Sequence, residues 1–135
     1  MPDFEARVTV TLRWRDVDML GHLNQSVYHE LLEEARAALF TKLERIGHFP
    51  FVIARVELDY RKEVRRDHGH VEVVARPGAV GRSSLVVEND VLLPDGTVAA
   101  EGRSVLVAWD REARRSRPFT EEERAVLIEL AGAPT

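Results

Sequence analysis

The chain has 135 residues, of which 44% are hydrophobic and 31% are charged, a composition typical of one globular domain rather than a disordered chain. Its 19 Lys and Arg residues against 23 Asp and Glu residues give a formal charge of −4, which argues against a nucleic-acid-binding surface. It has no cysteine, so disulfides, thiolate metal sites and cysteine nucleophiles are excluded.

We expect residues 1–135 to form a single domain in the cytoplasm, without a membrane partner. No apolar run approaches the roughly 20 residues of a transmembrane helix. The first eight residues, MPDFEARV, have neither the basic start nor the apolar core of a signal peptide. Lysine occurs only at Lys42 and Lys62, and all other basic side chains of the Lys and Arg class are arginines. We interpret this bias as a trait of the source genome in preference to evidence for a binding partner.

The N-terminal part predicts a strand followed by a long helix. Residues 4–15 alternate apolar with polar side chains, which indicates a strand with one buried face. Its apolar positions are Phe4, Ala6, Val8, Val10, Leu12 and Trp14. A helix is predicted from about Asn24 to Ile46, with Gly47 and Pro50 as its stop. Its apolar stripe comprises Val27, Leu31, Ala35, Ala38, Leu39, Leu43 and Ile46.

The remainder predicts four strands and a short helix. A second alternation covers residues 54–64, and Asp67 with Gly69 marks a turn. Strands are expected at 71–76 and 84–93, separated by the glycine-rich connection 77–81. The sequence Pro94-Asp95-Gly96 indicates a hairpin before a last strand at 97–109.

Residues 111–117 are expected to form a solvated charged loop. Thr120 and Glu123 form a capping-box pattern ahead of a short amphipathic C-terminal helix. The predicted order is therefore a strand, a long helix, four strands in hairpin succession and a small helix, which is an α+β fold. A mostly antiparallel sheet must wrap the one long helix to bury its apolar face. Because a single helix leaves apolar surface uncovered, we expect at least a homodimer.

The polar loop before the helix contains most of the residues that could bind a metal or take part in catalysis. Asp16, Asp18 and Gly21 match three positions of a calcium loop, but Leu20 and Val27 stand where oxygen ligands are required. The histidines lack the spacing of a zinc site, and no serine has the context of a nucleophile. We therefore expect neither a metal nor an organic cofactor.

A carboxylate beside a helix start suits acyl-transfer chemistry. If Asn24 is the N-cap, its side chain accepts from the N–H of Ser26 or Val27 and leaves the Gln25 N–H free. A free N–H at a helix N-terminus stabilises a carbonyl oxygen that gains negative charge. Asp18 could reach the same carbonyl as a nucleophile or general base. The alternative is that the Asp-x-Asp pair is plain turn and capping chemistry, and that His22 is only a packing or hydrogen-bonding residue.

The segment from Arg13 to Arg36, RWRDVDMLGHLNQSVYHELLEEAR, resembles the signature of the 4-hydroxybenzoyl-CoA thioesterase-like branch of the hotdog-fold acyl-CoA thioesterases. That signature combines an aromatic residue, an Asp-x-Asp pair, a Gly-His-x-Asn-Asn run, a tyrosine and a Glu-x-Ala-Arg run. The matching positions are Trp14, Asp16, Asp18, Gly21, His22, Asn24, Tyr28, Glu33 or Glu34, Ala35 and Arg36. A weaker likeness continues to about residue 110.

The resemblance implies a hotdog fold, in which a five-stranded antiparallel sheet wraps a long helix, and dimers or tetramers with active sites at subunit interfaces. It implies that Asp18 is the catalytic carboxylate and that the Gln25 amide polarises the thioester carbonyl. Gln25 replaces the second asparagine of the signature, which is harmless if only its backbone acts.

The remaining candidate site residues are expected to bind the substrate or to hold the loop in place. Substrate contacts are expected from His22, Asn24 and Tyr28. Asp16 and Gly21 are expected to hold the loop. Arg82 begins a Gly-x-Ser-Ser strand where similar proteins place basic groups near the CoA phosphates, and the alternative is an exposed strand-end arginine.

The function expected from this resemblance is hydrolysis of an acyl-CoA thioester. One alternative is a hotdog hydratase or dehydratase of acyl thioesters, which would use a histidine with a carboxylate and make His22 indispensable. Another is a non-catalytic acyl-CoA-binding protein. The sequence determines neither the acyl group nor the choice between CoA and an acyl carrier protein.

Overall fold

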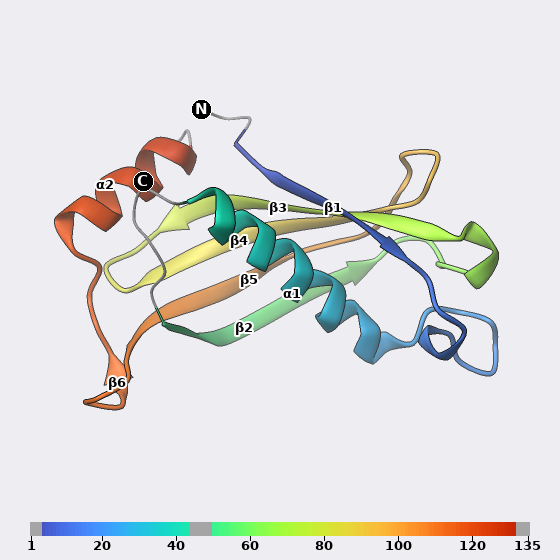
Figure 1. Ribbon diagram of the computed structural model, residues 1–135, viewed down its shortest axis with the longest axis horizontal. Coiled ribbons are helices and arrows are strands. Elements are labelled where there is room, and N and C mark those ends of the chain that lie inside the picture. The colour runs from blue at the N-terminus through green and yellow to red at the C-terminus, as the bar shows by residue number, and fades with distance from the viewer. Residues whose placement is uncertain (1–3, 44–49, 132–135) are drawn as a thin grey trace.

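An antiparallel sheet and the helix α1 (Gln25–Lys42) that lies across one of its faces dominate the structure, a computed structural model that describes residues 4–43 and 50–131 (Figure 1). The strands are β1 (Ala6–Thr11), β2 (Phe51–Tyr60), β3 (His70–Val80), β4 (Ser84–Leu92), β5 (Val98–Asp110) and β6 (Arg115–Ser116). The other helices are the 3₁₀ turns η1 (Trp14–Asp16) and η3 (Arg66–His68) and the C-terminal α2 (Glu121–Ala131). The predicted α+β hotdog architecture with a short C-terminal helix is confirmed.

The strand order is β1-β3-β4-β5-β2, with the two-residue β6 added to the end of β5. The predicted hairpins join β3 to β4 and β4 to β5, and all these pairs are antiparallel. The prediction that β2 also forms a hairpin with β3 is wrong. β1 occupies the place beside β3, so the chain crosses the sheet through α1 and adds β2 at the far edge, against β5.

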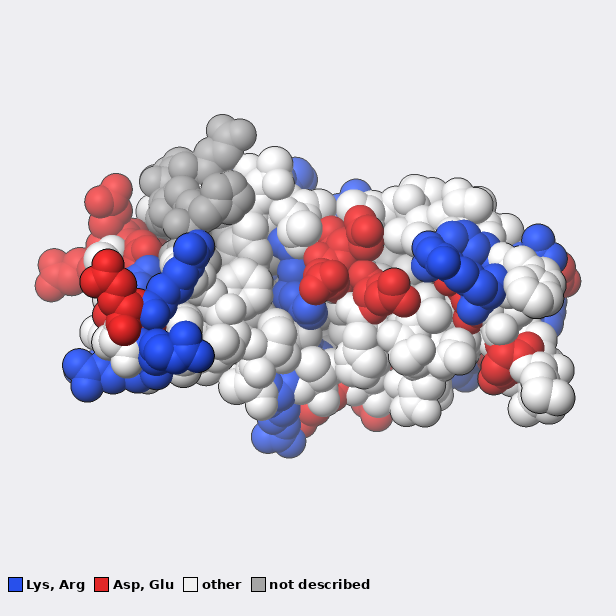
Figure 2. Space-filling view, turned by 60° about the horizontal axis from the view of Figure 1, so that its bottom comes forward, with Lys and Arg blue, Asp and Glu red and all other residues white. Residues whose placement is uncertain are grey.

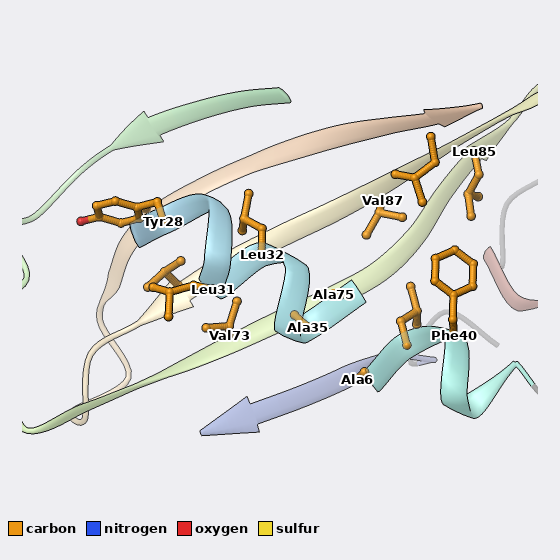
Figure 3. Packing of buried hydrophobic residues seen from close by; sticks show 14 of the residues in the cluster. Ala6, Tyr28, Leu31, Leu32, Ala35, Phe40, Val73, Ala75, Leu85 and Val87 are labelled. Carbon is orange, nitrogen blue, oxygen red and sulfur yellow. The ribbon is translucent and has the colours of Figure 1, made fainter. Parts of the chain in front are cut away.

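α1 forms as the apolar spacing predicts. Asn24 caps its start in an extended conformation, and the apolar side chains face the sheet. Figure 3 shows Leu31, Leu32 and Ala35 of α1 directed at the β3 and β4 side chains that they cover. Burial of each such Leu or Val stabilises the fold by about 1.5–3 kcal/mol. The helix ends at Lys42, earlier than predicted, and Ile46 and Gly47 lie outside the described residues.

Three predictions about the strands are corrected by the structure. The first strand ends at Thr11, and Trp14 is 74% exposed rather than buried, because the chain turns into η1. The expected connection 77–81 is strand as far as Val80, with an irregularity after Pro77.

The third correction is in β2. The register shifts between Ile53 and Arg55, so Ala54 is an extra residue and is exposed. This bulge lets both Phe51 and Leu58 pack against the core, although strict alternation would place them on opposite faces.

The C-terminal segment follows its prediction more closely. Residues 111–116 are exposed, as expected, although they include the short pairing of β6 with β5. The capping box is formed, since the Glu123 N–H donates to Thr120 Oγ1 at 3.1 Å and the Thr120 N–H donates to Glu123 Oε1 at 2.9 Å. Leu127 of α2 joins the main core.

The two ends of the sheet differ in character. The N-terminus of α1, the loop before it and the end of β2 lie together at one end of the sheet (Figure 1). The β3–β4 turn and α2 lie at the opposite end. Residues that are far apart in the sequence therefore meet at the start of α1.

Candidate active site

The loop that contains Asp18 is a tight hydrogen-bonded turn. The Asp18 N–H donates to the His22 carbonyl at 2.8 Å, and the Gly21 N–H donates to the Asp18 carbonyl at 3.0 Å. Gly21 has φ 81°, a left-handed conformation that glycine adopts without strain. Oδ1 of Asp18 accepts from the N–H groups of Leu20 and His22 at 2.9 and 3.2 Å. The Asp18 carboxylate is thus exposed to solvent and yet fixed by two backbone donors.

Asp16 lies behind this turn and is only 2% exposed. Its carboxylate accepts from the Arg13 N–H at 2.7 Å and from the Arg13 guanidinium at 2.9 Å. Burial alone would raise the pKa of Asp16, but the bonds and charge of Arg13 outweigh it, so the pKa is lowered. The Asp16 carbonyl also accepts from the Asn24 N–H at 2.7 Å, which ties the turn to the start of α1.

The start of α1 leaves one backbone donor open. Oδ1 of Asn24 accepts from the Ser26 N–H at 3.0 Å, and the Asn24 carbonyl accepts from the Val27 N–H at 2.9 Å. No residue within 4–43 and 50–131 accepts from the Gln25 N–H. The helix dipole adds partial positive charge at this donor, so it suits a developing oxyanion.

A cleft of about 460 Å³ opens beside this helix start. It is lined by His22, Leu23, Gln25, Tyr28, Tyr60, Arg61, Lys62, Glu63 and Val64. The Leu23 N–H donates to the Val64 carbonyl at 2.7 Å, and His22 forms a β-bridge with Arg65. These backbone contacts hold the segment after β2 against the loop before α1.

Two tyrosines form the aromatic part of the cleft. The rings of Tyr28 and Tyr60 meet edge to face, with centroids 4.9 Å apart and planes at 76°. In Figure 3 the Tyr28 hydroxyl points away from the core side chains. Burial, with a smaller contribution from Tyr60, raises the pKa of Tyr28. Its hydroxyl therefore stays neutral and can donate a hydrogen bond.

A charged chain runs along the cleft beside the tyrosines. Nε2 of His22 lies 3.3 Å from Oε2 of Glu63, and the Arg65 guanidinium lies 3.2 Å from Oε1 of Glu63. Arg65 also binds Asp67 at 2.9 Å. Glu63 is thus held between a histidine and an arginine.

The structure brings some of the predicted site residues together and separates others. His22, Gln25 and Tyr28 line the cleft, whereas the side chains of Asp16, Asp18 and Asn24 lie on the adjoining loop. Within one chain, Arg82 is not brought to the cleft, because it lies in the β3–β4 turn at the other end of the sheet. The roles assigned to these residues stay predictions.

The sequence analysis missed the contribution of residues 60–63 at the end of β2. A tyrosine, two cations and a carboxylate in succession were assigned only to an alternating strand. The available signal was the polar run Arg61-Lys62-Glu63, which interrupts that alternation.

Neither a metal-binding cluster nor a membrane-spanning helix is found in the described part of the chain. No group of three or more His, Asp or Glu side chains within residues 4–43 and 50–131 is arranged to hold a metal ion, and the expectation of a metal-free protein stays a prediction. No helix in the described part of the chain is long and apolar enough to cross a bilayer.

Comparison with known proteins identifies the class. Residues 12–127 match the thioesterase-like superfamily, and the chain belongs to that superfamily. It is 38% identical to a thioesterase from Thermus thermophilus whose crystal structure contains coenzyme A and Zn, with a TM-score of 0.81 and 96% of each chain covered.

Two further relatives agree. A predicted thioesterase from Bacillus stearothermophilus is 27% identical, with a TM-score of 0.83, and the match covers 97% of this chain and 99% of that one. The uncharacterized protein YsmA of Bacillus subtilis (strain 168) is 27% identical over 122 residues, covering 88% of this chain and 82% of YsmA.

The buried Asp16 generates a prediction for stability. Asp16→Asn should lower the free energy of unfolding at pH 7 by about 1.5–3 kcal/mol, because hydrogen bonds to a charged group are lost. Since the folded-state pKa is lowered, this contribution exists above the unfolded pKa of about 3.9 and disappears as the pH falls through the folded value. Urea unfolding of both proteins across this range should show the difference closing at acidic pH.

Asp18→Asn is the matched control, because Asp18 is exposed and its replacement should change the free energy of unfolding little. An Asp16→Asn penalty that stays constant down to pH 2 would show that the Asp16 charge does not stabilise the loop.

Proposed function

We propose that this protein hydrolyses an acyl-CoA thioester to a free acid and CoA, without a metal or organic cofactor. The open N–H of Gln25, at the start of α1 and on a residue that lines a partly apolar cleft, is the observation that carries the proposal. Membership of the thioesterase-like superfamily supports it. The coenzyme A in the crystal structure of the Thermus thermophilus thioesterase supports CoA as the thiol carrier.

The proposed reaction uses two groups of the chain. The thioester carbonyl oxygen accepts a hydrogen bond from the Gln25 N–H, which strengthens as negative charge develops on that oxygen. One such donor contributes about 2.7–4 kcal/mol to the transition state. Asp18 either removes a proton from the attacking water or attacks the carbonyl carbon itself. If Asp18 is the general base, water adds to the carbonyl carbon, the C–S bond breaks to give the free acid, and the proton that Asp18 took passes to the departing CoA thiolate. If Asp18 is the nucleophile, the C–S bond breaks to leave a mixed anhydride on Asp18, and water then hydrolyses this anhydride to the free acid and Asp18.

The other cleft residues bind the substrate in this proposal. The neutral Tyr28 hydroxyl donates a hydrogen bond to the substrate, and the Tyr28 and Tyr60 rings pack against its apolar part. His22 and Asn24 shape the loop that carries Asp18.

One observation favours a second candidate, a hydratase or dehydratase of acyl thioesters. His22 and Glu63 form a histidine–carboxylate pair inside the cleft, 3.3 Å apart, whereas Asp18 does not line it. In that mechanism His22 would exchange the proton and Asp18 would only support the loop.

Asp18→Asn should separate the two candidates. The variant keeps the shape of the side chain and its ability to accept the two backbone bonds, but it loses the negative charge. It should fold and bind acyl-CoA normally, while kcat for thioester hydrolysis falls at least about a hundredfold, the scale of a positioned acid or base. Steady-state hydrolysis of a panel of acyl-CoAs would measure this.

His22→Gln is the comparison variant, and it should lose less activity than Asp18→Asn. A larger loss at His22, with hydration of an enoyl-CoA by the unmodified protein, would support the hydratase. Full hydrolysis by Asp18→Asn would refute the mechanism. A single turnover in ¹⁸O-labelled water tests the role of Asp18. Label in the aspartate shows that Asp18 is the nucleophile and that water attacked the aspartyl carbonyl of the anhydride, whereas a general base leaves all of the label in the released acid.

We also infer that the functional unit contains at least two copies of the chain. Among the described strands, β2 pairs only with β5, so its other edge offers free backbone groups. Ile53 on this strand is 40% exposed. In the view that brings β2 forward, residues other than Lys, Arg, Asp and Glu make up most of the lower middle of the surface, with a few charged groups at its lower edge (Figure 2).

A buried arginine beside the free edge of β2 also supports a second copy of the chain. A recess of about 500 Å³ between α1 and β2 is lined by Arg36, Phe40 and Phe51, among others. Arg36 is only 9% exposed, and within residues 4–43 and 50–131 its one side-chain hydrogen bond goes to Ser104 Oγ at 3.3 Å. Burial lowers the pKa of Arg36 and the charge of Glu33 partly opposes this. A second copy would supply acceptors that the buried guanidinium lacks.

The expected assembly is testable by light scattering. The protein should have a mass of at least twice the 15.3 kDa of one chain. Ile53→Lys should shift it toward the monomer, because a charge is placed on the covered edge. Thr9→Lys adds the same charge on β1, at the opposite edge of the sheet, and should leave the dimer intact. A stable and fully active monomer would contradict the inference.

A further inference from the structure

The phosphate-bearing part of a CoA ester needs a cation near the cleft, and the sequence candidate is not there. Arg82 lies in the β3–β4 turn, where its carbonyl accepts from the Phe119 N–H at 2.9 Å. Within one chain this turn and the start of α1 lie at opposite ends of the sheet (Figure 1). The basic side chains that border the cleft are those of Arg61, Lys62, Arg65 and His22.

All of these groups except one are already paired. Arg61 binds Glu101 at 2.7 Å and approaches Asp59 at 3.8 Å. Arg65 and His22 share Glu63. The Lys62 ammonium forms no ion pair or hydrogen bond with any residue in the described ranges 4–43 and 50–131. Lys62 is thus the open positive charge of the cleft.

The backbone of Lys62 is fixed although its side chain is free. The N–H groups of Arg61 and Lys62 both donate to the Ala99 carbonyl, at 2.7 and 3.0 Å, and the Val64 carbonyl is bound by Leu23. The anchored backbone keeps the exposed ammonium near the cleft, while the flexible stem lets it follow a ligand. A compact ammonium on such a stem is a common phosphate ligand.

The size of the cleft indicates where that phosphate would lie. A volume of about 460 Å³ is in the range that holds one drug-sized group. It suits the acyl group and part of the carrier arm, and the phosphates of that arm must then lie at the rim, where the side chain of Lys62 is exposed.

We propose that Lys62 binds a phosphate of the phosphopantetheine carrier arm at the rim of the cleft and so sets the affinity for the thioester. This inference rests on the proposed function, since it concerns the substrate of the same cleft. The proposed ligand group is a phosphate anion that is present both in CoA and in the phosphopantetheine arm of an acyl carrier protein.

Three esters of one acyl group test the proposal, namely acyl-CoA, acyl-phosphopantetheine and acyl-pantetheine, of which the last has no phosphate. Lys62→Gln should raise KM for acyl-CoA about two- to fivefold, the scale of one exposed ion pair, with kcat unchanged. KM for acyl-pantetheine should not change. Lys62→Arg should restore most of the affinity, and KM of the unmodified protein should depend more steeply on salt than that of Lys62→Gln.

Lys42→Gln is the matched control, because Lys42 is the other lysine of the chain and its Nζ donates to the Glu5 carbonyl at the far end of α1. It should leave every KM unchanged. An effect of Lys62→Gln on acyl-phosphopantetheine as well as acyl-CoA would assign the contact to the phosphate that both carriers share. An effect on acyl-CoA alone would overturn the proposal, because Lys62 would then contact the nucleotide phosphates of CoA and not the phosphate of the carrier arm.

An equal rise in KM for acyl-pantetheine, or no change for acyl-CoA, would overturn the proposal. Calorimetric binding of free CoA and of pantetheine keeps this result separate from the proposed function. Suppose that no ester is hydrolysed but Lys62→Gln still weakens the binding of CoA and not that of pantetheine. The proposed hydrolysis would then be refuted, while the phosphate contact of Lys62 would be supported.

Discussion

The hydrogen bond between the Asn24 side chain and the Ser26 N–H determines what the start of α1 can do. A helix cannot satisfy its first N–H groups from within. Here the cap satisfies the second residue of the helix by its side chain and the third by its carbonyl, and leaves the first, Gln25, open. Because the Asn24 N–H is itself bound by the Asp16 carbonyl, the open donor is held rigidly. Rigidity matters, since a preorganised donor needs no rearrangement when charge develops.

The sheet topology turns this helix end into a site. β1 pairs with β3 and β2 lies at the far edge, so α1 must cross the sheet, and the end of β2 returns to the start of α1. The Leu23–Val64 backbone bond fastens the two together. The N-cap, two tyrosines and Lys62 therefore lie together beside the loop that carries Asp18, although they come from segments about forty residues apart in the sequence.

Local rules predicted the parts of this arrangement that depend on neighbouring residues. The N-cap at Asn24, the glycine turn at Gly96, where φ is 89°, and the Thr120–Glu123 capping box all follow from interactions within four residues. Prediction failed where partners are distant. Nothing near β2 indicates that it pairs with β5, and the bulge at Ala54 exposes a residue that the alternating pattern assigned to the buried face. The cleft residues after Tyr60 were missed for the same reason, because their role arises only from contact with the start of α1.

The central claim is that the Gln25 N–H stabilises the oxyanion, and replacing Gln25 by proline tests it most directly. Proline removes this one donor and is well tolerated at the first position of a helix, and Asn24, with φ −62° and ψ 133°, already has the conformation that a residue before proline prefers. Gln25→Pro should keep the fold and lose about 10²–10³ in kcat for thioester hydrolysis, whereas Gln25→Ala, which keeps the N–H, should retain nearly full activity. A folded Gln25→Pro protein as active as Gln25→Ala would contradict the account.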